Sequence, residues 1–290
     1  MITRFDHAVL AVRDLGQATD RYRNVLGMDV YPGGRHAGRG THNAIVRFGL
    51  DYLELLSIDD RSEALAAGIR RASLVDYLDR WEGGMVGYCL ACDDLDALAD
   101  RFERTGLEAM GPFDMERLRP DGVLLRWRLV VPGNNSWRRP WPFFIQWEMS
   151  DGERLQLETP GQHPLGVNGV IGVSVVVEDL EAACYLYEEQ IGLEIIAEEV
   201  IEPLQARSIR FKVAGTTIEL LAPTGDGPAQ RHVDTHGEGL FDLVLHSPDR
   251  AKSLAVLEQA SVAVEPAPER PNSWVIAPTT ALGARFVLSE

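Results

Sequence analysis

Hydrophobic positions follow two patterns along the chain, short aliphatic runs and stretches with helical spacing. Ala8–Val12 is a short aliphatic run, which predicts a buried strand. Asp14 follows as a candidate N-cap, and Gly27 is a candidate helix stop. The apolar residues between these two have the spacing of one helix face: Leu15, Ala18, Tyr22 and Leu26.

Three further strands complete this first unit. One begins at Asp29–Tyr31, and Asn43–Phe48 and Tyr52–Ser57 form two more around a tight turn. The glycine-rich segment Gly33–Asn43 is interpreted as a loop before the third strand. The order of elements is therefore β-α-β-β-β.

The same pattern returns later in the chain. Residues 170–195 repeat residues 5–30 at a constant shift of 165 positions, and the same shift places Glu54 on Glu219. Weaker copies start at Gly87–Cys92 and Leu240–His246, each followed by an Asp and an amphipathic stretch. We therefore predict an α+β protein of four βαβββ modules, with residues 59–82 (partly helical), 161–167 and 225–239 as connections.

Composition limits the possible partners. Hydrophobic residues make up 45% and charged residues 25% of the 290 positions, which is typical of a globular protein. The net charge of −16 would repel nucleic acid and anionic membranes. The apolar runs are too short for a membrane span, and the N-terminus lacks the pattern of a signal peptide. Three cysteines suit a reducing compartment, so we expect a cytoplasmic protein.

The four modules resemble the vicinal-oxygen-chelate superfamily of glyoxalases, bleomycin resistance proteins and dioxygenases. The segments GGRHAGRGTHN (33–43), YLELL (52–56) and PFFIQW (142–147) are similar to its glyoxalase-like domain branch. The resemblance implies that modules pair, so that two curled mixed sheets enclose cavities and carry their helices outside. It implies an N-terminal domain at 1–160 with the candidate active site and a C-terminal domain at 167–290 with a degenerate one.

The resemblance also implies a metal site. Ligands in this superfamily come from the start of the first strand and the middle of the last strand of a module. On this chain those places hold His7 and Glu54 in module one, and Gly87 and Gln146 in module two. The implied ligands of a divalent ion (Mn, Fe, Ni, Zn or Mg) are therefore His7, Glu54 and Gln146.

Strand alternation provides a separate argument. If Ala8, Leu10 and Val12 pack under the helix, His7 faces the opposite, concave side. By the same argument Asn43, Arg47 and Glu54 face the cavity. Glu54 is then either a metal ligand and catalytic carboxylate or the partner of Arg47 in a buried salt bridge, and both hypotheses remain open.

Loop and aromatic residues add candidates for contact with a substrate. His36 and His42 lie in the glycine-rich segment, where each is either a third metal ligand or a proton carrier, or else a surface histidine. His36 and Asn43 are also candidate substrate contacts. Trp127 and Trp141 belong to an aromatic and arginine-rich part of module two. They form either a wall that binds an organic anion or ordinary core packing.

Two functions are compatible with these residues. The first is a metal-dependent enzyme of isomerase, lyase or dioxygenase type, in which Glu54, His42 and Arg47 act on a small oxygenated organic substrate. The second is a metal-free protein that binds or sequesters an aromatic or cationic small molecule. A monomer and a homodimer are both compatible with the paired modules.

Overall fold

A strand followed directly by a helix recurs four times in the computed structural model. The structure describes the whole chain except residues 120, 135 and 136; for residues 69 and 70 it describes only the backbone. The pairs are β1 (Ile2–Val12) with α1 (Leu15–Asn24), β5 (Gly83–Cys92) with α4 (Leu95–Thr105), β9 (Val170–Val176) with α6 (Leu180–Tyr185), and β13 (Gly239–His246) with α8 (Arg250–Gln259).

An aspartate caps each of these four helices. Its side chain accepts a hydrogen bond from the backbone N–H three residues later, at Asp14, Asp94, Asp179 and Asp249. Such a carboxylate satisfies a free N–H and interacts favourably with the helix dipole. The four module starts predicted from the repeat are confirmed.

Three more strands follow in every module. They are β2 (Tyr31–His36), β3 (Thr41–Arg47) and β4 (Tyr52–Ile58); β6 (Ala109–Leu118), β7 (Leu124–Pro132) and β8 (Phe143–Trp147); β10 (Glu194–Ile201), β11 (Ala206–Val213) and β12 (Thr216–Pro223); and β14 (Val264–Pro266), β15 (Trp274–Ile276) and β16 (Phe286–Ser289). The segment Gly33–Asn43, expected as a loop, is therefore mostly a hairpin of β2 and β3.

The connections contain additional helices. They are α2 (Arg61–Ala66), α3 (Ile69–Arg80), α5 (Asp151–Leu157) and α7 (Pro228–His236), with a π-helical segment Leu186–Ile191 and a short 3-10 helix Glu202–Leu204. Helix α7 lies within the predicted connection 225–239 between β12 and β13; it has Pro228 at its start and buries Ala229. None of the helices in the described residues has the length and apolar character that a membrane span requires.

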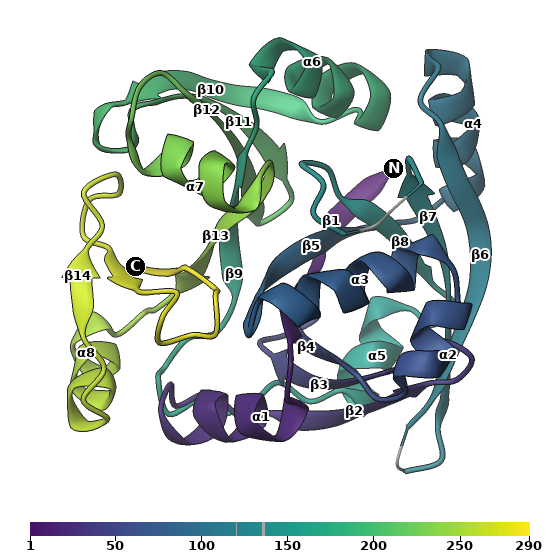
Figure 1. The fold of residues 1–290 in the computed structure, drawn as a ribbon, viewed down its shortest axis with the longest axis horizontal. Coiled ribbons are helices and arrows are strands. Elements are labelled where there is room, and N and C mark those ends of the chain that lie inside the picture. The colour runs from purple at the N-terminus through teal and green to yellow at the C-terminus, as the bar shows by residue number, and fades with distance from the viewer. Residues whose placement is uncertain (120, 135–136) are drawn as a thin grey trace.

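The strands form two mixed sheets of eight with the same topology. The first has the order β2-β3-β4-β1-β5-β8-β7-β6, and the second repeats it with every strand number raised by eight. In each sheet two modules meet along a central antiparallel pair, β1 with β5 and β9 with β13. The first sheet curls until its edge strands β2 and β6 are in contact (Figure 1). The predicted class of paired, curled sheets is confirmed.

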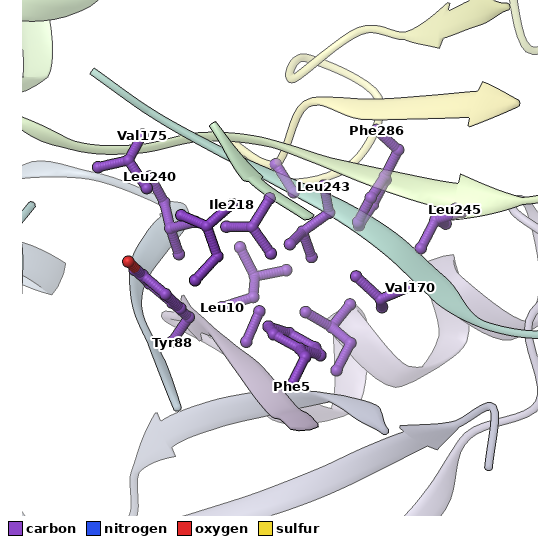
Figure 2. Close-up of a cluster of buried hydrophobic side chains, with 14 of the residues drawn as sticks. Phe5, Leu10, Tyr88, Val170, Val175, Ile218, Leu240, Leu243, Leu245 and Phe286 are labelled. Atoms are coloured by element: carbon purple, nitrogen blue, oxygen red, sulfur yellow. The ribbon is translucent and has the colours of Figure 1, made fainter. Parts of the chain in front are cut away.

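One apolar core joins the two sheets. Phe5, Leu10 and Tyr88 of the first sheet pack in one cluster with Ile218 and Leu240 of the second (Figure 2). Burial of each large side chain stabilises the fold by about 1.5–3 kcal/mol. Val9 and Ala11, which alternate with Leu10, belong to a smaller cluster on the concave side of the first sheet. The alternation along β1 therefore separates the core from a cavity.

Candidate active site

The concave side of the first sheet encloses a narrow cavity of about 80 Å³. Its polar lining consists of His7, His36, Arg39, Asn43, Glu54, Arg71 and Arg117. Its apolar lining is mainly aromatic, with Tyr52, Trp127, Trp137, Phe143 and Trp147. Apolar walls with a few convergent polar groups are typical of a small-molecule site.

A β-bulge in β1 places Asp6 beside His7. Neighbouring residues of a strand normally point to opposite faces, but the pairing of β1 with β5 shifts by one residue between Phe5 and His7. Asp6 Oδ1 consequently lies 2.7 Å from His7 Nδ1. The other oxygen of the fully buried Asp6 accepts hydrogen bonds from Arg4 at 2.6 Å and from Trp147 Nε1 at 3.0 Å.

The electrostatic surroundings keep Asp6 ionised. Burial by itself raises the pKa of Asp6, but the hydrogen bond from His7 and the charges of Arg4 and Arg154 outweigh it, so this pKa lies well below its usual range. The carboxylate therefore accepts the Nδ1–H of His7 and leaves Nε2 directed at the cavity.

Glu54 faces this imidazole from β4. Its Oε2 lies 3.9 Å from His7 Nε2, and its Oε1 accepts a hydrogen bond from Asn43 Nδ2 at 2.5 Å. The repeat equivalent Glu219 has different surroundings: it is paired with Arg210 at 3.3 Å and with Arg270, and it accepts a hydrogen bond from Ser208 at 2.8 Å. The second sheet thus neutralises its carboxylate with two arginines, whereas Glu54 meets an amide and an imidazole.

His36 reaches the same cavity from edge strand β2. Its Nδ1 lies 2.9 Å from Thr41 Oγ1, and its Nε2 lies 3.5 Å from Asn43 Nδ2. Burial lowers the pKa of His36 to about 4; the charge of Glu54 opposes this shift, and the charges of nearby arginines add to it. His36 is therefore a neutral imidazole at pH 7.

Arg47 does not pair with Glu54, which corrects the salt-bridge hypothesis. Its guanidinium bonds to Glu158 at 2.8 Å and lies 4.8 Å from the centre of the Tyr52 ring. The reason is register, because Ile45 stands opposite Glu54 while Arg47 stands opposite Tyr52. Arg47 belongs to a buried ion-pair network beneath the cavity and does not line it.

Three other candidates lie away from the cavity. His42 Nδ1 lies 3.8 Å from Asp59 on the outer side of the hairpin. Gln146 accepts a hydrogen bond from Arg128 at 2.7 Å and donates one to the Asp93 carbonyl at 2.6 Å. Trp141 packs against the core between the sheets, and its Nε1 donates to the Pro132 carbonyl at 3.3 Å. The structure brings together His7, His36, Asn43, Glu54 and Trp127.

Strand register explains the position of Gln146. Val9 and Cys89 each precede the aspartate that caps the next helix by five residues, so they are equivalent in modules one and two. Val9 stands opposite Glu54, and Cys89 stands opposite Phe143. The residue of module two at the place of Glu54 is therefore Phe143, and Gln146, an odd number of residues further on, faces the other side.

The sequence analysis missed the cations of the cavity. The arginines that it grouped with the tryptophans of module two lie elsewhere: Arg126 pairs with Glu116, Arg128 with Asp96, Arg138 contacts Tyr77 and Arg139 contacts Trp141. The cavity is lined by Arg39, Arg71 and Arg117 instead. The alternation of Phe113 and Met115 with Asp114 and Glu116 was the available signal, but β6 was not recognised as a strand.

The donor set is compatible with one divalent ion. Ligand atoms that each bind an ion at about 2.1 Å can lie up to roughly 4.2 Å apart, and the 3.9 Å between His7 Nε2 and Glu54 Oε2 satisfies this limit. Asp6, His7 and Cys89 form a second group with donor atoms within 4.8 Å of one another. Burial raises the pKa of the Cys89 thiol well above its usual value, and Asp6 already has its partners, so this group is the poorer ligand set.

Family models match both halves of the chain. The model described as "Glyoxalase-like domain" matches residues 5–191. The model described as "Glyoxalase/Bleomycin resistance protein/Dioxygenase superfamily" matches residues 169–277. A search of the curated proteins finds no match.

Solved structures share the fold over the full length. A hypothetical protein from Staphylococcus aureus is similar with a TM-score of 0.72 and 18% identity, covering 100% of this chain and 99% of that one. A mutant of 4-hydroxymandelate synthase from Streptomyces coelicolor is similar with a TM-score of 0.64 and 17% identity, covering 99% of this chain and 92% of that one. At these identities the similarity extends to the fold.

Proposed function

Because the chain belongs to the glyoxalase-like domain family, we propose that it is an enzyme that acts on a small oxygenated organic molecule in the cavity of the first sheet. His7 and Glu54 would hold a divalent ion there. Such an ion, when bound, would hold substrate oxygens and act as a Lewis acid in an isomerisation, lyase or oxygenation reaction.

The contrast between Glu54 and Glu219 carries the proposal. The two carboxylates occupy the same place in the repeat, and only Glu219 is paired with two arginines. A buried carboxylate without a cation is costly unless a ligand or a proton compensates its charge. Glu54, opposite the free nitrogen of an imidazole, has the environment of a metal ligand or of a group that moves protons.

Residues of the chain have separate tasks in this proposal. Asp6 orients His7 through Nδ1, as carboxylates do for metal-binding histidines. The neutral His36 is able to form a hydrogen bond with a substrate in the cavity. Trp137 and Phe143, both largely buried, exclude water from one side of the cavity.

Metal analysis tests the proposal. We expect about one divalent ion per chain in protein purified without added metal, and loss of that ion in His7→Ala and Glu54→Gln. His42→Ala is the matched control, because His42 lies on the outer side of the same hairpin region and should keep the ion. Titration of stripped protein with Mn²⁺, Ni²⁺ and Zn²⁺ gives a second measurement. Metal that persists in His7→Ala, or no binding by the wild type, would contradict the proposal.

A metal-free binding protein is the second candidate. It is favoured by the second module, which offers Gly87 and Phe143 at the two places where the family has ligands. The cavity then serves for binding alone. In that case stripped protein binds its ligand as tightly as protein supplied with metal.

A further inference from the structure

We propose that the cavity binds an organic anion, with its negative group against Arg39 and Arg117 and its apolar body among the tryptophans. This inference names the class of substrate for the same cavity and so deepens the proposed function. It rests on the proposed function only for the role of the end of the ligand that faces His7 and Glu54.

The charge of the cavity differs from the charge of the chain. Among the described residues that line it, three arginines stand against the single carboxylate of Glu54, although the chain carries a net charge of −16. The local potential is therefore positive, and it favours an anionic ligand over the cationic one that the overall charge suggested.

Arg117 shares its carboxylate partner with other arginines. It is 8% exposed, and its nearest anionic partner is Glu158 at 3.5 Å. Glu158 is already bound by Arg47 at 2.8 Å and by Arg154 at 3.0 Å. The buried Nε of Arg117 has no hydrogen-bond partner among the described residues. A guanidinium in such a position is stabilised by a carboxylate or similar group from a ligand.

Arg39 has a weak partner. Its Nη2 contacts the sulfur of Met115 at 2.9 Å, and a thioether is a poor acceptor for a cation. In the second sheet the arginines near Glu219 and Asp242 have carboxylate partners: Arg210 and Arg270 pair with Glu219, and Arg285 pairs with Asp242 and Glu269. The difference between the two sheets indicates that the first one leaves room for an anion from outside.

The arrangement also orients the ligand. Arg39 follows β2 and Arg117 lies on β6, where the two edge strands of the curled sheet meet. His7 and Glu54 lie on the central strands β1 and β4. Trp127 and Trp147, with ring centres 5.2 Å apart, form an aromatic wall of the same cavity. An anion held at the seam therefore extends along aromatic rings toward the proposed metal ligands.

A series of matched probes tests the charge preference. Phenylacetate, phenylacetamide and phenethylamine share a ring and differ in charge, and quenching of tryptophan emission reports their binding to metal-stripped protein. We expect phenylacetate to bind at least tenfold more tightly than the other two. Equal or tighter binding of the amide or the amine, or no binding of phenylacetate at 10 mM, would overturn the proposal.

Arginine variants test the location. Arg117→Gln and Arg39→Gln should each weaken phenylacetate binding about tenfold or more. Arg39 lies in a hairpin, so Arg39→Gln should disturb folding less than Arg117→Gln. Arg126→Gln is the control, because Arg126 lies on the neighbouring strand and pairs with Glu116 on the outer face. An equal loss in Arg126→Gln, or no loss in either cavity variant, would contradict the site.

The anion site and the metal site can be tested separately. Glu54→Gln removes the one negative charge of the cavity and should tighten phenylacetate binding several-fold while abolishing metal binding. If metal is absent but phenylacetate binding depends on Arg117, the anion site stands and the metal site falls. If metal binds but phenylacetate is not preferred, the anion site falls alone.

Discussion

At the scale of single residues, the site depends on an ionised carboxylate that is fully buried. Asp6 is bound by His7, Arg4 and Trp147, and Arg154 lies 3.5 Å away. Removal of one partner from a buried charge network leaves the remaining charges uncompensated, which usually costs more than the network contributes. Asp6 is therefore expected to govern both the orientation of His7 and the stability of the first sheet.

Asp6→Asn tests this role. The amide keeps the shape and loses the charge, so we expect the affinity for a divalent ion to fall about 10–100-fold and the free energy of unfolding to fall by about 3–5 kcal/mol. Calorimetric metal titration and urea denaturation measure the two effects. Asp151→Asn is the control, because Asp151 also pairs with Arg4 but is exposed, and its loss should cost less than about 1 kcal/mol. Equal effects of the two variants would contradict the assignment.

The sequence predicted part of this site, and it missed the rest because a bulge and the strand register decide which face a residue occupies. Alternation along β1 identifies His7 as a cavity residue, but it assigns Asp6 to the opposite face, since a bulge leaves no mark in the pattern of apolar residues. Similarly, Gln146 was chosen by residue type, whereas strand register places Phe143 opposite the equivalent of Val9. Register depends on pairing between distant segments, which a single sequence does not contain.

At the scale of elements, the first hairpin shows why glycine misled the prediction. The segment Gly33–Asn43 was expected as a loop because glycine is flexible, yet β2 runs to His36. A Cβ on Gly33 would lie 1.9 Å from Asn43 Oδ1, so the glycine permits close approach of the neighbouring strand. Strand β6, with Gly111 and Pro112, was not recognised, and the cation Arg117 was missed with it.

Helix α7 places a partly buried histidine, His232, against strand β13. His232 lies 5.2 Å from His236 and 5.4 Å from Phe241 of β13, measured between ring centres. Burial lowers the pKa of His232 to about 4, and the charges of His236 and Arg138 outweigh the opposite effect of Asp242. An unfolded histidine has a pKa of about 6.5. Between these values the unfolded chain binds a proton that the folded chain does not, so stability falls as the pH decreases.

His232→Gln should reduce this pH dependence. We expect the loss of unfolding free energy between pH 7 and pH 5 to be about 1–2 kcal/mol smaller in the variant than in the wild type. Below pH 4 the residue is protonated in both states and the difference should stop growing. Urea denaturation at several pH values measures the slopes. Identical slopes would show that His232 remains accessible to protons in the folded protein.

At the scale of the whole molecule, the core between the sheets links their stabilities. Leu243 of β13 is fully buried in the cluster that also contains Phe5 and Leu10. Because one core serves both sheets, we expect the chain to unfold in a single transition despite its repeated architecture. Both the repeat and the alternation predicted the modules, but the packing of one sheet on the other required the structure.

Leu243→Ala measures this coupling. The substitution should cost about 2–5 kcal/mol and shift the unfolding of both halves together. All tryptophans except Trp274 lie in the first half, so tryptophan emission reports mainly on the sheet that does not contain the substitution. Its midpoint should move with the circular dichroism midpoint. A tryptophan transition that stays in place would indicate independent halves.

The bulge in β1 between Phe5 and His7 makes the site sensitive to chain length as well as to residue identity. Deletion of Phe5 would leave the imidazole and every carboxylate in the sequence, yet it would remove the extra residue of this bulge in the pairing with β5. His7 and its carboxylate would then point to opposite sides. A relative of this chain can therefore retain all the residue types of the site and lose its geometry through a change that comparison of those residues alone does not detect.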